Sequence, residues 1–259
     1  MAGDNADQGD WHQSDVMKTT IKRVLWCACV CGMMTLMLSA CARDNGVEQV
    51  SEITSMREEK RSAPIVYVAL GDSTGAGVGA RDGRGYVARL FERIERERPG
   101  SRVMNVCVSG AETADVLRGQ LPRIDGASAA LITLGIGIND IGHGVKIEQF
   151  ARNYEEIIRR LREKTNAPIV VANIPDISLA PRVPMALHDT VNRQIQLFNS
   201  HIDEIARRHN VQVVDAYQMS REVVPARTDF FSEDGFHPSA AGYEHWAESM
   251  WPTVRAALK

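Results

Sequence analysis

The segment 65–77, Ile-Val-Tyr-Val-Ala-Leu-Gly-Asp-Ser-Thr-Gly-Ala-Gly, constrains the fold of this chain more than any other stretch. Six mostly apolar residues, rich in β-branched and aromatic types, run directly into Gly-Asp-Ser and a glycine-rich loop. This pattern predicts a short buried strand that ends in a tight turn. Because ligands bind at the carboxyl edge of the sheet in open α/β folds, the turn would present the hydroxyl of Ser73 at that edge.

From residue 64 onward, strand-like and helix-like segments alternate along the chain. Short apolar runs predict strands, and apolar residues at helical spacing predict helices between them, with Thr113 as the N-cap of one short helix. The expected strands are 65–70, 102–108, 129–134, 168–172 and 211–214, and the longer helices are 85–98, 147–164, 189–208 and 240–258. Such alternation is typical of a parallel sheet with helices on both faces, so we expect a three-layer α/β domain over residues 64–259.

Composition and charge limit the classes of function. The 259 residues are 44% hydrophobic and 24% charged, which fits one large globular domain. The formal net charge of −3 gives no electrostatic reason to expect a nucleic-acid partner. His, Cys and carboxylate residues show no cluster with metal-ligand spacing, so we expect neither a metal site nor a cofactor.

The N-terminal part of the chain carries the features of an export signal. Lysine and arginine residues precede an uncharged run from Val24 to Leu38, as in a secretory signal. The following Leu38-Ser39-Ala40-Cys41 resembles the lipobox of bacterial lipoproteins, in which cleavage leaves a lipid-modified cysteine at the new N-terminus. An uncleaved signal-anchor helix is the alternative, although the run is near the short limit for spanning a bilayer.

These features predict how the N-terminal part is processed. We expect a signal peptide over residues 1–40, with translation starting at Met17, and a polar tether over residues 41–63. A lipid on Cys41 would anchor the exported protein to a membrane of the cell envelope, on the periplasmic or cell-surface side. Cys107 would then be the remaining cysteine of the mature chain; it lies in an apolar segment, and we expect it in the core rather than as a catalytic thiol.

A hydroxyl nucleophile needs a base, and the base needs an orienting acid. Of the seven histidines, His237 alone lies in an Asp-Gly-Phe-His-Pro segment, and Pro238 favours an extended loop there. Asp234, three residues earlier in a turn, can reach Nδ1 of the imidazole and leave Nε2 free to face Ser73. The alternative is that Asp234 and His237 are surface residues that meet by chance. This explanation is weaker in a chain that also contains a Gly-Asp-Ser turn.

The tetrahedral intermediate of acyl transfer also needs fixed hydrogen-bond donors for its oxyanion. The backbone N–H of Ser73 is one candidate. Gly110, after the second expected strand, can present its N–H without a side chain in the way, and Asn139, after the third, carries a neutral amide donor. Gly and Asn are common in turns, so neither residue alone indicates an oxyanion site. The hypothesis rests on their placement after neighbouring strands.

Four blocks in this order resemble the signature blocks of the SGNH (GDSL) hydrolase family, over residues 64–259: Gly71-Asp72-Ser73, Gly110, Gly137-x-Asn139-Asp140 and Asp234-x-x-His237. The resemblance implies a flavodoxin-like, five-stranded parallel sheet. It also implies a catalytic triad of Ser73, His237 and Asp234, with oxyanion donors from Ser73, Gly110 and Asn139. Thr74 stands where the family's name motif has Leu, and we expect its side chain to face away from the chemistry.

The expected activity is hydrolysis of carboxylic esters of the esterase, lipase or lysophospholipase type, with a small-molecule or lipid ester as substrate. The segment 176–188 has no family signature, and we expect it to wall the acyl pocket. Three alternatives stay open: an α/β-hydrolase with Gly71-x-Ser73-x-Gly75 as its nucleophile elbow, a carbohydrate O-acetyl esterase of the same fold, and a lipoprotein that binds its ligand without catalysis.

Overall fold

The computed structural model describes residues 63–259, in which five parallel strands form one sheet. The strands are β1 (Val66–Gly71), β2 (Arg102–Asn105), β3 (Leu131–Gly135), β4 (Ile169–Ala172) and β5 (Gln212–Val214). Their spatial order is β2-β1-β3-β4-β5, which is the flavodoxin-like arrangement. The carboxyl ends of β1 and β3 lie at the point where the strand order reverses, and ligands of such sheets bind there.

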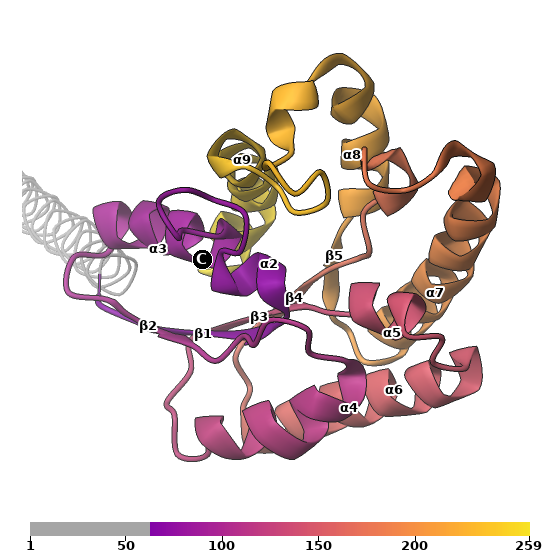
Figure 1. The fold of residues 1–259 in the computed structure, drawn as a ribbon. Helices are drawn as coiled ribbons and strands as arrows, with labels where there is room; N and C mark the ends of the chain where they lie inside the picture. The colour runs from indigo at the N-terminus through magenta and orange to yellow at the C-terminus, as the bar shows by residue number, and fades with distance from the viewer. Residues whose placement is uncertain (1–62) are drawn as a thin grey trace, which may run out of the picture. The chain divides into compact units, whose positions relative to one another are not determined.

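The sheet separates two hydrophobic clusters, and helices cover both faces (Figure 1). One cluster packs the sheet against α6 (Ile147–Lys164) and α7 (His188–Arg208), and the other packs it against α3 (Tyr86–Glu97) and α9 (Ala240–Ala257). The central strands β1, β3 and β4 are buried on both faces, which explains their continuous apolar sequences. The predicted three-layer α/β fold is therefore confirmed.

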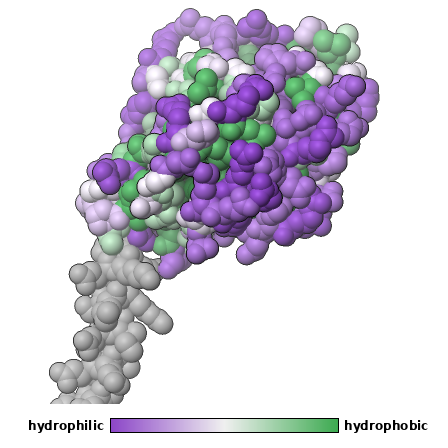
Figure 2. All heavy atoms as spheres, turned by 90° about the horizontal axis from the view of Figure 1, so that it is seen from below, coloured by the Kyte–Doolittle hydropathy of each residue, from purple (hydrophilic) through white to green (hydrophobic). Residues whose placement is uncertain are grey.

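Shorter helical segments occupy the connections between these elements. These are α2 (Ser73–Ala76), α4 (Thr113–Asp115), α5 (Ile138–Gly142) and α8 (Ala216–Val223), together with the short turns η1 (Val116–Gln120), η2 (Leu121–Ile124), η3 (Ile177–Leu179), η4 (Met185–Leu187), η5 (Val224–Ala226) and η6 (Thr228–Phe230). The face seen from below is mostly hydrophilic around a narrower area of apolar side chains (Figure 2).

Two local expectations were wrong in detail. The strand expected over 102–108 ends at Asn105, although the backbone N–H groups of Val106 and Val108 still donate to β1 at 2.9 and 3.1 Å. Thr113 is the first residue of α4 rather than its N-cap, which is Glu112. The hydroxyl and N–H of Thr113 instead donate to the buried carboxylate of Asp140, at 2.5 and 3.0 Å.

The predictions for the N-terminal part lie outside the described residues. They comprise the signal peptide over 1–40, the start at Met17, the lipid on Cys41 and nearly all of the tether over 41–63. Within residues 63–259, no helix combines the length and the apolar character that crossing a membrane requires.

Candidate active site

The turn after β1 is built around a glycine that no other residue could replace without a shift of the backbone. Gly71 has a φ of +152°, and a Cβ there would lie 2.3 Å from the carbonyl oxygen of Gly135 on the neighbouring strand. The buried side chain of Gln120 binds both backbone groups of Gly71: its Oε1 accepts from the N–H at 2.9 Å and its Nε2 donates to the C=O at 2.7 Å. The end of β1 is thereby held where Ser73 begins α2.

Asp72 caps α2 and lies buried directly before Ser73. Its Oδ1 accepts hydrogen bonds from the N–H of Thr74 at 2.9 Å and from the Thr74 hydroxyl at 2.7 Å. Burial raises the pKa of Asp72 to about 6, and these two hydrogen bonds limit the rise. Thr74 lines the same cavity as Ser73, and its hydroxyl is held by Asp72.

Ser73, His237 and Asp234 form one hydrogen-bonded chain. His237 Nε2 lies 3.0 Å from Ser73 Oγ, and His237 Nδ1 lies 2.6 Å from Asp234 Oδ2. The structure therefore brings together the three residues named from the sequence, across 164 positions of chain between Ser73 and His237. Their geometry is the one that a serine nucleophile, a general base and an orienting carboxylate require.

The loop that carries His237 is fixed by its own backbone. Asp234 Oδ1 accepts from the N–H groups of Phe236 and His237 at 2.8 and 2.9 Å, and from the Ser232 hydroxyl at 2.8 Å. Partial burial acts to raise the pKa of Asp234, but the hydrogen bond from the His237 ring and these further donors hold it well below its usual value. The carboxylate is therefore negatively charged at neutral pH.

Gly110 and Asn139 follow β2 and β3, the two strands that flank β1. Asn139 Nδ2 donates to the carbonyl oxygen of Ala111 at 2.9 Å, which ties the amide to the loop of Gly110. Asp140, the next residue, holds the same loop through Thr113. Gly110 is exposed with a φ of +79°, and neither Gly110 nor Asn139 lines the cavity that contains Ser73.

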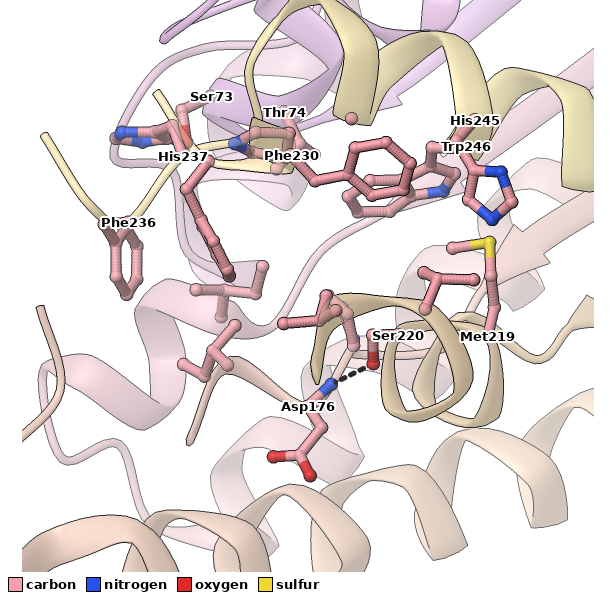
Figure 3. Close-up of a pocket in the computed structure, with 18 residues that line it drawn as sticks. Ser73, Thr74, Asp176, Met219, Ser220, Phe230, Phe236, His237, His245 and Trp246 are labelled. Carbon is pink, nitrogen blue, oxygen red and sulfur yellow. Dashed lines mark hydrogen bonds between the residues drawn. The ribbon is translucent and has the colours of Figure 1, made fainter. Parts of the chain in front are cut away.

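A cavity begins at Ser73 and His237 and extends away from them between α8 and α9 (Figure 3). Of the segment 176–188, which was expected to wall the acyl pocket, Asp176 and Ile177 line it, and the other residues do not. The wall comes instead from α8, from the aromatic residues around η6 and from the start of α9. The cluster of Phe230, Phe231 and Phe236 beside His237 was the sequence signal that could have indicated this wall.

The described residues also bear on the expectations for metal ligands and for Cys107. In residues 63–259, no group of three or more His, Cys, Asp or Glu side chains is arranged to hold a metal ion. Cys107 is half-buried against the core cluster of α3 and α9, and burial raises the pKa of its thiol well above the usual range. A thiol of this kind is a poor nucleophile, so the expectation that Cys107 packs in the core agrees with its surroundings.

Comparisons with known proteins agree on one family. Residues 69–245 match the model of the GDSL-like lipase/acylhydrolase family. The chain is 25% identical to esterase TesA of Pseudomonas aeruginosa over 203 residues, which cover 77% of this chain and 92% of TesA. It is 26% identical to a GDSL-like esterase of Mycobacterium tuberculosis over 206 residues, which cover 77% of this chain and 65% of that protein.

Solved structures show the same fold. The crystal structure of TesA superposes with a TM-score of 0.62 at 25% identity, over 74% of this chain and 99% of the other. A catalytic mutant of the acetylxylan esterase Axe2 from Geobacillus stearothermophilus superposes with a TM-score of 0.64 at 19% identity, over 74% of this chain and 95% of Axe2. The chain belongs to the GDSL-like lipase/acylhydrolase family and is an SGNH-type ester hydrolase.

Proposed function

We propose that this protein hydrolyses carboxylic esters through an acyl-enzyme formed on Ser73, with His237 as general base and acid and Asp234 as the residue that orients His237. The observation that carries the proposal is the hydrogen-bonded chain from Ser73 Oγ through the imidazole to the Asp234 carboxylate, with distances of 3.0 and 2.6 Å. The activity belongs to the esterase, lipase or lysophospholipase type.

In the first half-reaction, Ser73 Oγ attacks the ester carbonyl carbon while Nε2 of His237 takes the hydroxyl proton. The resulting imidazolium is stabilised by the negative charge of Asp234. When the tetrahedral intermediate collapses, the bond to the alcohol oxygen breaks and His237 returns the proton to that oxygen. Water then attacks the acyl-enzyme with the same proton transfers, releasing the acid and restoring the Ser73 hydroxyl.

The oxyanion of each tetrahedral intermediate needs donors that are already in place. We assign this role to the N–H groups of Ser73 and Gly110 and to the side-chain amide of Asn139. The Asn139 amide carries two hydrogens, and the bond to the Ala111 carbonyl occupies one of them, so the second is available for the oxyanion. The bond to Ala111 also fixes the orientation of the amide before substrate arrives.

The direct test is hydrolysis of p-nitrophenyl esters by the full chain in detergent, beside its Ser73→Ala variant. We expect turnover by the unaltered protein and a loss of several orders of magnitude in the variant. Equal rates for the two proteins would remove Ser73 from the chemistry, whatever the ester.

We also propose that the protein is exported and held at a membrane of the cell envelope by a lipid on Cys41. The lipobox-like Leu38-Ser39-Ala40-Cys41 after the basic and apolar segments supports this proposal. Its test is incorporation of labelled palmitate in a bacterial host, with Cys41→Ser as the control. Equal labelling of the two chains, or labelling of neither, would contradict the lipid anchor.

A further inference from the structure

The cavity beside Ser73 is lined almost entirely by apolar groups (Figure 3). Ser73 and His237 lie at one end, and Met219 of α8 and His245 of α9 lie at the opposite end. Aromatic rings and aliphatic side chains form the walls between the two ends, among them Val223, Val224, Phe230, Phe236 and Trp246.

Two polar side chains of the wall, Ser220 and Asp176, are already engaged elsewhere, whereas the indole Nε1 of Trp246 is buried without a hydrogen-bond partner among the described residues. Ser220 Oγ donates to the carbonyl of Tyr217 at 2.7 Å and accepts from the Asp176 N–H at 2.8 Å. The Asp176 carboxylate points away from the cavity (Figure 3). His245 stacks on Phe230 with 5.2 Å between ring centroids. A sugar or glycerol group would therefore find few hydrogen-bond partners here, whereas a hydrocarbon chain would leave apolar surface out of water.

The fully buried Asp176 carboxylate holds α8, which forms one wall of this cavity, in place. Its Oδ1 accepts from the Ser178 hydroxyl at 2.5 Å, and its Oδ2 accepts from Asn192 Nδ2 of α7 at 2.7 Å and from Arg221 of α8 at 2.8 Å. The bond between the Asp176 N–H and Ser220 adds a second link to α8. Since α8 is connected to η3 and α7 by these contacts, its apolar face is a fixed wall.

The order of the two half-reactions decides which part of an ester occupies the cavity. The alcohol must leave before water attacks, and by microscopic reversibility water approaches along the path by which the alcohol left. A cavity lined by hydrocarbon is a poor route for that water. The acyl group, in contrast, stays bound to Ser73 through both steps, so it is the part that fits there.

We propose that this cavity is an acyl-chain site whose length limit is set by Met219, and that the enzyme prefers esters of unbranched medium-chain acids to acetate esters. This inference rests on the proposed function of Ser73. Each methylene group that enters the cavity should raise kcat/KM about fourfold, which corresponds to about 0.8 kcal/mol. The increase should stop at the chain length at which the acyl group reaches Met219.

The test compares kcat/KM for monomeric p-nitrophenyl acetate, butyrate, hexanoate, octanoate, decanoate and dodecanoate. Met219→Trp fills the far end of the cavity, so the ratio of octanoate to acetate should fall by about tenfold or more. Met219→Ala removes most of the side chain at the far end and so lengthens the cavity, which should shift the preferred acyl chain to a greater length. The neighbouring Gln218 is exposed and does not line the cavity, so Gln218→Trp is the matched control and should keep the chain-length profile of the unaltered protein.

The outcomes separate this inference from the proposed function. Ser73-dependent hydrolysis that is fastest with acetate, or a profile that is the same in both Met219 variants, would overturn the acyl-chain site and leave the esterase intact. A rate that depends on the length of the alcohol in alkyl acetates, and not on the acyl chain, would also overturn it. Hydrolysis that does not depend on Ser73 would instead contradict the proposed function.

Discussion

The carboxyl group of Asp72 is buried next to the proposed nucleophile, and replacing it with an amide should change how stability depends on pH. Burial raises the pKa of Asp72 from 3.8 to about 6. The folded protein therefore binds this proton more tightly than the unfolded chain does. Between about pH 4 and pH 6, stability should fall as the pH rises, because ionising a buried carboxyl costs free energy.

The size of the effect follows from the two pKa values. A rise from 3.8 to about 6 corresponds to about 3 kcal/mol, which is the stability lost through this group once the pH is above 6. In Asp72→Asn this loss is absent. The amide oxygen can still accept the two hydrogen bonds from Thr74, and Asn is as good an N-cap as Asp.

Thermal unfolding of the two proteins from pH 4 to pH 7.5 measures the difference. The Tm of Asp72→Asn, relative to that of the unaltered protein, should rise by about 6–12 °C over this range for about 3 kcal/mol in a domain of this size. Any cost of the substitution that does not depend on pH cancels in the comparison. A difference in Tm that stays constant, or that falls as the pH rises, would refute a buried carboxyl with a raised pKa.

Three further substitutions test the parts of the site separately. Asp234→Asn removes the charge that stabilises the imidazolium and should lower kcat/KM by about 10²–10⁴ at pH 7; a decrease of less than about tenfold would remove Asp234 from the triad. Asn139→Ala should lower kcat by about 10²–10³, measured by steady-state ester hydrolysis, and unchanged turnover would exclude the amide as an oxyanion donor. Gln120→Ala leaves the N–H of Gly71 without its buried partner, while the C=O keeps its bond from the Val108 N–H, so the substitution should destabilise the fold by about 1–3 kcal/mol in denaturant unfolding. An unchanged midpoint would show that the Gln120 contacts are replaceable.

The sequence predicted those parts of the site in which residues close together in the chain, or at the ends of neighbouring strands, supply the functional side chains. Asp234 and His237 are three residues apart in one turn, so their contact follows from the loop itself. The alternation of apolar segments with helical patterns likewise determines a parallel sheet, and the carboxyl ends of its strands lie at one edge. The sequence alone therefore predicts the position of Ser73 at that edge.

The parts that were missed depend on contacts between distant positions. Gln120 binds Gly71 across 49 positions, and nothing in the sequence around η1 indicates that the amide turns towards β1. Thr113 is anchored by Asp140, which lies 27 positions away, and this contact competes with the capping role that its type suggests. The position of α8 over the cavity depends in turn on the Asp176 contacts with α7 and α8.

Labelling with a fluorophosphonate, followed by peptide mass spectrometry, tests the central claim most directly, because the reagent reacts with an activated serine whatever the natural ester is. We predict one adduct, on Ser73 of the full chain, and at least a hundredfold slower labelling in His237→Ala, since the base that activates the hydroxyl is then absent. An adduct on another residue, no adduct at all, or equally fast labelling in the His237 variant would contradict a Ser73–His237–Asp234 triad.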